Sequence, residues 1–467
     1  MRFVIQQAFD QDRTSRIDSA ILACEFCQYL RVQVLDVREA TMDNDGKSMM
    51  MMAKDMFPLN RSLTGQGNIQ TLNILKNVAE DLDILGFKTG TKVFDWTVPP
   101  VWECHSGILR DPSGKVLCDF KLNNLSVVGY STGIKAKLSL EELMPHLHSL
   151  PNQPSAIPYV TSYYAPNWGF CITDHEKSRL KTGTYEVEID ASFQDGEMNY
   201  GELLISGGQK TEIFFSTYIC HPSMANNEIS GPVVAAFLAK YVKSLPNRRH
   251  SYRFVFLPET IGSIAYLSRN LKEMKDKVIA GWVLTCVGDD RDFSFLPSRF
   301  GSSLADHVSL DVFESKGIRP TIYSWLERGS DERQYCAPGV DLPVASVMRT
   351  KYWEYPEYHT SLDTLGDVVT ESGLKGSLDF YKGVIDLLES DPPPRALTLG
   401  EPQLGKRGLY SQVSKIGSGD ASKNLLNVWT FCDGVHTVPT ISRKANLSIR
   451  EVRHFLQILE EHGLVSS

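Results

Sequence analysis

The sequence predicts an α/β fold in which helices flank a mostly parallel sheet. Apolar runs typical of buried strands alternate with stretches of helical apolar spacing after Lys210. Hydrophobic residues make up 42% of the chain and aromatic residues 10%, which is enough for a sizeable core. With 467 residues, the chain is long enough for about two to four domains.

The alternation begins with the buried run TEIFFSTYIC, residues 211–220. Further strands are predicted at 251–258, 278–288 and 341–349. Helices are predicted at 231–242, 262–274, 302–315 and 367–389. In the first of these helices Pro232 stands in the first turn, a position that tolerates proline. Apolar residues at helical spacing also predict a helix upstream, over residues 67–87.

The chain is predicted to divide into an N-terminal extension at 1–45, an α/β domain at 46–102 and 203–390, an inserted β-rich domain at 103–202 and a winged-helix domain at 395–467. The pair Asp195-Gly196 is one of the turns that mark the β-rich stretch. A proline run after Asp391 predicts a linker. Beyond it, Ser448 and Glu451 form the capping-box pattern of a helix start. We predict no role for the extension.

Charge and composition exclude several classes of protein. The 48 basic and 56 acidic residues give a net charge of −8, which disfavours binding to a phosphate backbone. The C-terminal 48 residues carry equal numbers of basic and acidic side chains, so nucleic acid is not the expected partner of the winged helix either. No apolar run approaches the ~20 residues of a membrane helix. Nine scattered cysteines and no signal-peptide pattern predict a reducing, cytoplasmic location.

Polar side chains follow the predicted strands where each strand ends. His221 follows the first strand, Glu259 the second and Asp289 the third, and His359 lies in the segment after the fourth. Because ligands of open α/β sheets bind at the carboxyl ends of the strands, these side chains are candidates for one site. Imidazole and carboxylate together are zinc ligands, and a neighbouring carboxylate can move a proton for a zinc-activated water.

These residues carry a resemblance to a known family. A strand followed by His221, a loop ending in Ser230-Gly231 before a helix, Glu259 after the next strand and the motif Tyr358-His359-Thr360-x-x-Asp363-Thr364 resemble the zinc aminopeptidases of the M28 type. The chain from about 46 to 467 is more closely similar to a bacterial subfamily of aminopeptidase-like proteins of the domain of unknown function 4910 type. The stretches that carry this similarity are FDWTVP (94–99), HSLPNQPSAIPYVTSYY (148–164), CHPSMANNE (220–228), PETIGS (258–263) and GSDERQYC (329–336).

The resemblance implies a peptidase-like core, an inserted β-rich domain and a C-terminal winged helix, in a subfamily often associated with surface-polysaccharide gene clusters. The M28 pattern also implies two zinc ions, but here Asn227 stands at the bridging aspartate, Thr260 at a ligand glutamate and Thr285 at a further aspartate. We therefore expect one zinc ion. Its expected ligands are His221, His359 and a nearby acid, for which Glu228 is preferred and Asp289 and Asp331 are the alternatives.

Each candidate also has a structural interpretation. His221 could simply hydrogen-bond the following turn, and Glu259 and Glu228 could interact with helix N-termini. Asp331 and Arg333 either form an ion pair or contact the substrate, as Asp289 also could. Our preferred assignment makes Glu259 the catalytic base and these last three residues the substrate-binding groups.

The predicted function is a zinc-dependent hydrolase of amide bonds that acts on a short peptide or a small aminoacyl or sugar-linked molecule. The substrate class follows from the family resemblance and not from the residues. The alternative is a non-catalytic binding or assembly protein that retains the fold, which Asn227 and Thr260 favour. A homo-oligomer is compatible with the sequence. A winged-helix regulator with a ligand-sensing domain is disfavoured by the neutral C-terminal charge.

Overall fold

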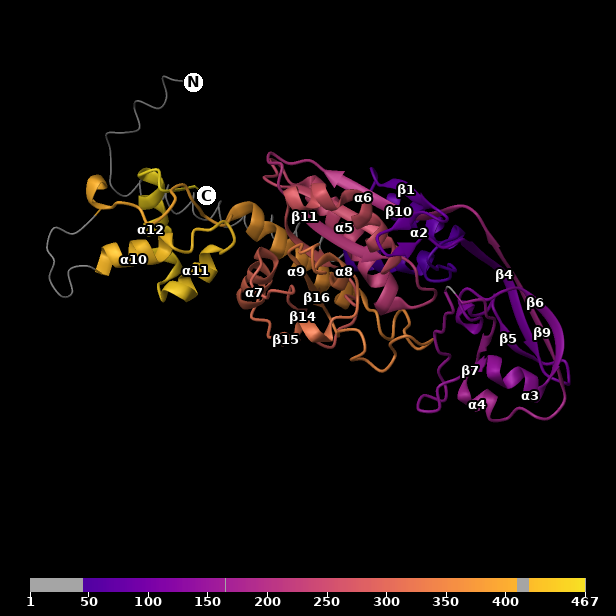
Figure 1. The fold of residues 1–467 in the computed structure, drawn as a ribbon. Coiled ribbons are helices and arrows are strands. Elements are labelled where there is room, and N and C mark those ends of the chain that lie inside the picture. Colours follow the sequence, from indigo (N-terminus) through magenta and orange to yellow (C-terminus); the bar gives the residue numbers. More distant parts are fainter. Residues whose placement is uncertain (1–44, 164, 410–419, 467) are drawn as a thin grey trace, which may run out of the picture. The chain divides into compact units, whose positions relative to one another are not determined.

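The computed structural model describes residues 45–163, 165–409 and 420–466 (Figure 1). Almost all of the predicted N-terminal extension therefore lies outside the described residues. Residues 49–56 are helical, and four methionines of this stretch (Met49, Met50, Met52 and Met56) are buried in the main core. No helix among the described residues is both long and apolar enough to span a bilayer.

The centre of the molecule is an eight-stranded mixed sheet. In their order across the sheet, the strands are β1 (Asp83–Lys88), β10 (Glu197–Ile205), β12 (Ser251–Leu257), β11 (Glu212–Tyr218), β13 (Val278–Val283), β16 (Val344–Met348), β14 (Ser294–Leu296) and β15 (Thr321–Ile322). Four neighbouring strands, β12, β11, β13 and β16, run parallel. Antiparallel pairs, such as β1 with β10 and β14 with β16, occur toward the edges. The carboxyl ends of the four parallel strands consequently meet at one edge.

Helices cover both faces of this sheet. One face packs against α2 (Gln66–Lys76), α5 (Ser230–Ser244), α7 (Leu304–Ser315) and α9 (Glu371–Ser390). The other packs against α6 (Ile261–Lys277) and α8 (Glu332–Tyr335). Every side chain of β11 is buried, as expected for a strand covered on both faces. Four of these helices (α5, α6, α7 and α9) agree with the predicted ones to within a few residues at each end, whereas the short α8 was not predicted.

The predicted helix over 67–87 is wrong in its second half. The helix ends at Lys76, and residues 83–88 instead form β1, which pairs antiparallel with β10. The apolar spacing of this stretch does not show where pairing with a distant strand replaces helical hydrogen bonding. The short strands β14 and β15 were also not predicted from the sequence, because two or three residues carry no periodic signal.

The inserted region has its own four-stranded antiparallel sheet in the order β5-β4-β9-β6. The strands are β4 (Val101–Arg110), β5 (Val116–Asp119), β6 (Ile134–Ser139) and β9 (Thr184–Gln194). Smaller elements complete the region, namely β7 (Leu147–His148), β8 (Phe170–Cys171), α3 (Leu140–Leu143) and α4 (Asp174–Lys177). Its buried side chains are continuous with the core on the α6 face of the large sheet. The turn at Asp195-Gly196 leads directly into β10 of the large sheet, so the insertion ends a few residues before the predicted boundary.

The described part of the C-terminal region contains three α-helices and a two-stranded sheet. Its elements are β17 (Arg395–Ala396), α10 (Asp420–Trp429), α11 (Val438–Ala445), α12 (Ile449–Glu461) and β18 (Val465–Ser466). The two strands pair antiparallel, which gives the winged-helix arrangement. The predicted capping box of Ser448 and Glu451 is confirmed, because each side chain bonds the backbone N–H of the other. The region has a separate small core.

Candidate functional site

Two of the candidate residues lie side by side because β11 and β12 are parallel neighbours. His221 follows the end of β11, and Glu259 follows the end of β12. The Nε2 atom of His221 lies 3.7 Å from Oε2 of Glu259. The backbone N–H of Glu259 donates to the sulfur of Cys220 at 3.1 Å, which ties the two strand ends together.

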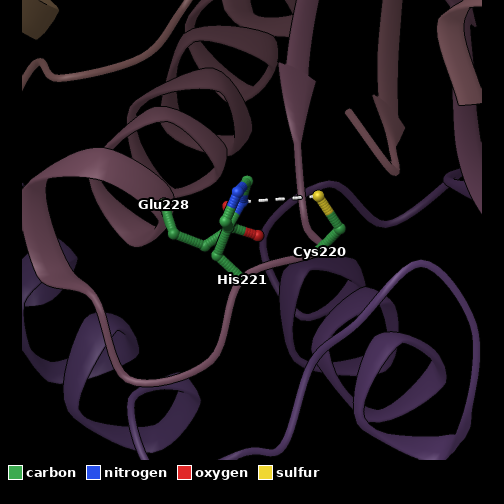
Figure 2. Close-up of side chains that lie close together, drawn as sticks. All are labelled: Cys220, His221 and Glu228. Atoms are coloured by element: carbon green, nitrogen blue, oxygen red, sulfur yellow. Dashed lines mark hydrogen bonds and ion pairs between the residues drawn. The ribbon is translucent and has the colours of Figure 1, made fainter. Parts of the chain in front are cut away.

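The other ring nitrogen of His221 is held from behind by Glu228. A single π-helical turn, Ala225–Ile229, precedes α5 and carries Glu228 toward the ring. Nδ1 of His221 and Oε2 of Glu228 are 2.8 Å apart. The sulfur of Cys220 lies 3.4 Å from the same nitrogen, and Figure 2 shows the three side chains together. Burial alone would lower the pKa of His221, but Glu228 and then Glu259 outweigh it and raise that pKa. The bond to Nδ1 leaves Nε2 directed at Glu259.

A buried arginine that the sequence did not single out lies next to Glu228. Arg61 is 1% exposed, and its Nε donates to the main-chain oxygen of His221 at 3.1 Å. The same Nε is 3.9 Å from Oε1 of Glu228. A buried carboxylate needs a counter-charge, and Arg61 supplies it. Arg61 lies 160 residues before His221, and no local pattern announces such a partner.

His359 comes from the loop between β16 and α9. The centroid of its ring lies 5.4 Å from that of His221. Tyr358 stacks on the ring of His359 at 3.9 Å. Burial, followed by the neighbouring His221, lowers the pKa of His359 to about 3, so the imidazole stays neutral at physiological pH. Neither of its ring nitrogens bonds to a described residue, which leaves a lone pair available.

Backbone strain gathers at this edge of the sheet. Four described residues other than glycine have positive φ here: Thr260 with 64°, His359 with 56°, Cys286 with 51° and Ser223 with 41°. Such conformations are uncommon outside glycine and persist where the surroundings fix them, often at functional sites. Asp331 fixes Thr260, because its Oδ1 accepts the Thr260 N–H at 2.7 Å and the Ser263 hydroxyl at 2.7 Å.

The three predicted substrate-binding residues occupy different places. Asp331 is fully buried, and burial followed by repulsion from Glu259 raises its pKa to about 7. Arg333 donates to the Thr260 hydroxyl at 2.6 Å and lies at the same side of the site. Asp289 is buried and accepts bonds from the side chain of Asn226 and from Thr350. Its carboxylate therefore braces two loops, and its contact with a substrate stays a prediction.

A neutral cluster stands where the M28 resemblance implies acidic ligands. The hydroxyl of Tyr218 bonds to the hydroxyl of Thr285 and accepts from Nδ2 of Asn227 at 2.8 Å. Thr285 also donates to the main-chain oxygen of Asn227 at 3.1 Å. All three side chains are buried, and none carries a charge. Tyr218 was missed by the sequence analysis, because it reads as one more apolar residue of a buried strand.

Two groups of side chains at this edge could supply donors for a zinc ion, one behind the ring of His221 and one at its Nε2. Cys220, His221 Nδ1 and Glu228 do lie close enough together to consider a metal. However, Nδ1 and Glu228 are already bonded, and burial raises the pKa of the Cys220 thiol, whereas a metal requires the thiolate. On the other side, both ring nitrogens of His359 make no hydrogen bond to a described residue, and Nε2 of His221 has only its 3.7 Å contact with Oε2 of Glu259. A histidine that binds a metal is usually oriented by a carboxylate bonded to its other ring nitrogen.

Sequence comparison identifies relatives along most of the chain. Residues 50–391 match the family described as domain of unknown function (DUF4910), and residues 393–467 match a winged helix-turn-helix family. A protein of Clostridium acetobutylicum is 39% identical over 412 residues, which cover 88% of this chain and 94% of the relative. That protein carries the provisional name of a polysaccharide biosynthesis protein with an aminopeptidase-like domain.

Solved structures give the same fold. A crystal structure from Clostridium acetobutylicum, provisionally designated a peptidase, superposes with a TM-score of 0.77 at 37% identity, over 91% of this chain and 97% of the other. A zinc aminopeptidase of Bacillus subtilis gives 0.55 at 14% identity, over 74% and 94%. A peptidase M28 precursor of Shewanella amazonensis gives 0.52 at 11% identity, over 75% and 95%. The last two show that the fold is that of the M28 zinc aminopeptidases. The chain belongs to the family of the domain of unknown function DUF4910, with a winged helix-turn-helix at its C-terminus.

Proposed function

We propose that the protein is a zinc-dependent hydrolase of amide bonds with a single metal site. The observation that carries this proposal is the free Nε2 of His221, which faces Glu259 at 3.7 Å while Glu228 holds Nδ1. His221 and His359 are the residues that would hold the ion. Glu228, which the sequence suggested as a third ligand, instead supports His221 from behind.

The chain's own groups divide the chemistry between them. When bound, zinc supplies a lowered pKa for a water molecule and polarises the scissile carbonyl. Glu259 is partly buried, with 20% of its side chain exposed, and burial raises its pKa. A carboxylate with a raised pKa accepts a proton from the attacking water more readily and then returns it to the leaving amine. Glu228 keeps the ring of His221 in one orientation throughout.

The surroundings of the site support a small substrate. The partly buried tyrosines Tyr159 and Tyr358 contact the rings of the two histidines. Tyr163, which is also partly buried, and Tyr358 are close enough to Glu259 to interact with its carboxylate electrostatically. Aromatic rings offer flat apolar faces with a polar tip, which suit a small ring-shaped or aminoacyl group. The provisional name of the Clostridium relative refers to polysaccharide biosynthesis. We therefore propose an aminoacyl or acylated sugar-like substrate of surface-polysaccharide metabolism.

Elemental mass spectrometry of the full-length protein tests the proposal. We expect about one zinc per chain in the wild type, none in His359→Ala, and one in the control His454→Ala, whose histidine is exposed on α12. A screen of aminoacyl amides and amino-sugar amides should then give activity in the wild type and the control alone. Two zinc ions per chain would contradict the single site, and zinc-free wild type after zinc is supplied would contradict the hydrolase.

One observation favours a second candidate, a non-catalytic binding protein. The neutral cluster of Tyr218, Asn227 and Thr285 is held together by hydrogen bonds without an ion. This is expected of a protein that keeps the fold but has lost metal-dependent catalysis. If the wild-type protein contains no zinc in the experiment above, the non-catalytic binding protein becomes the better-supported candidate.

A further inference from the structure

A segment of the inserted region runs along the loop that carries His359. The backbone N–H of Tyr159 donates to the main-chain oxygen of His359 at 2.9 Å, and Pro158 and Thr360 form an antiparallel bridge. Ile157 bonds twice to Ser361: its N–H donates to the serine hydroxyl at 3.0 Å, and its oxygen accepts the serine N–H at 2.9 Å. This short ladder attaches the insertion to the loop.

The ladder bears on a strained residue. His359 has a left-handed backbone with φ 56°, which a residue with a side chain adopts only when its neighbours hold it there. The insertion bonds to the carbonyl of His359 and to the two residues that follow it, and upstream Nε2 of Gln153 donates to the main-chain oxygen of Pro356 at 2.6 Å. Without these bonds the loop would lose the contacts on the far side of the strained position.

The side chain of Tyr159 also connects the insertion to the His359 loop. Its ring meets His221 with centroids 5.1 Å apart and His359 with centroids 5.3 Å apart, edge to face in both cases. Its hydroxyl bonds to the hydroxyl of Tyr163 at 3.2 Å, which fixes the ring. One aromatic ring from the insertion thus touches both imidazoles of the candidate metal site.

We propose that Tyr159 is a positioning residue of the metal site, and that the insertion is a working part of that site and not a separable module. Tyr159 acts through the imidazoles: its ring limits their rotation, while its backbone holds the His359 loop. The proposal rests on the proposed function, because it assigns the two histidines to one ion.

Two measurements on the full-length protein test this role. The first is the zinc dissociation constant, determined by competition with a chromophoric chelator. The variants are Tyr159→Ala, Tyr159→Leu and Tyr159→Phe, with Trp168→Ala as the matched control, because Trp168 is an aromatic residue of the same insertion that stacks on His146. The second is the spectrum of the ring nitrogens in metal-free, ¹⁵N-histidine-labelled protein, with His359 assigned from the spectrum of His359→Ala.

We expect Tyr159→Ala and Tyr159→Leu to weaken zinc binding by about 10–100-fold, the usual effect of losing a group that supports a metal ligand. Tyr159→Phe keeps the ring and should bind zinc as the wild type does, and so should Trp168→Ala. In the metal-free spectra, the Ala and Leu variants should broaden or split the His359 resonance, and Phe should restore it. Leu decides the matter if the Ala variant fails to fold, as judged by circular dichroism.

Folded Ala or Leu variants with wild-type zinc affinity and an unchanged His359 resonance would overturn the proposal. A wild type that binds no zinc would contradict the proposed function instead. In that case the metal-free spectra still decide whether Tyr159 positions His359.

Discussion

Two groups of side chains at the same edge of the sheet satisfy their polar atoms in different ways. Tyr218, Asn227 and Thr285 bond to one another, and within this cluster only Oδ1 of Asn227 lacks a partner among the described residues. His221 and His359 instead keep ring nitrogens free, beside a carboxylate with a raised pKa.

The difference shows what each group requires. A neutral hydrogen-bonded cluster is stable by itself, because burying it leaves no charge without compensation. The histidine group combines strained backbones, free lone pairs and buried carboxylates, which together favour a cation. One half of the edge therefore needs no cation, whereas the other half contains the histidines that we propose as metal ligands.

The largest expected effect separates proton transfer from metal binding. Glu259→Gln keeps the size of the side chain but removes the proton acceptor, so kcat should fall by about 10²–10⁴-fold. Zinc content measured on the same sample should match the wild type, since the two histidines are intact. Full activity in Glu259→Gln would show that another group takes the proton. Loss of zinc would make Glu259 a ligand.

The next prediction attempts to convert the neutral half into a metal site. Asn227→Asp places a carboxylate at a position that is 2% exposed and has no cation among its hydrogen-bond partners. We expect the free energy of unfolding of the metal-free protein to fall by about 3 kcal/mol, as for other uncompensated buried charges. Urea denaturation measures this loss.

The zinc content of Asn227→Asp should stay near one per chain, because Tyr218 and Thr285 offer no further acid. The control Asn227→Leu loses the hydrogen bonds but gains no charge, so it isolates the charge term. A second zinc ion in Asn227→Asp would show that a single residue separates the two halves.

The smallest expected effect concerns the charged half and pH. Burial, followed by repulsion from Glu259, raises the pKa of Asp331 from its ordinary value of 3.8 to about 7. Between these two values the folded protein binds a proton that the unfolded chain does not, so this group makes the folded state less stable as pH rises. In metal-free protein, the stability of Asp331→Asn relative to the wild type should therefore increase from pH 5 to pH 8. A constant difference in urea denaturation across that range would contradict the raised pKa.

The parts of the site near the strands were accessible from the sequence. His221 and Glu259 stand where buried strands end, and the parallel order of these strands determines that they meet. Glu228 was predicted as a metal ligand and not as the support of His221, because a sequence does not show which side of a ring a carboxylate approaches. The fold class and the winged helix followed from periodicity and caps, which are local signals.

The missed residues depend on contacts that are distant along the chain. Arg61 contacts His221, which lies 160 residues further along the chain. The ring of Tyr159, in the insertion, contacts the ring of His359, which lies near the end of the α/β domain. Arg61 lies in no quoted pattern, and Tyr159 lies in the stretch 148–164 that carries the family similarity, which does not show what the tyrosine contacts. Their roles appear only when the partner is known.

The ladder between the insertion and the His359 loop also bears on how the protein folds. Ile157 and Ser361 are 204 residues apart, so their pairing closes a very long loop, and contacts of this kind form slowly. During synthesis, the strands that carry His221 and Glu259 can assemble before residue 361 has left the ribosome. The histidine pair is then completed at a late step, and a nascent or truncated chain holds only half of the site. The hydrolytic activity that we propose would thereby be restricted to molecules that have finished folding.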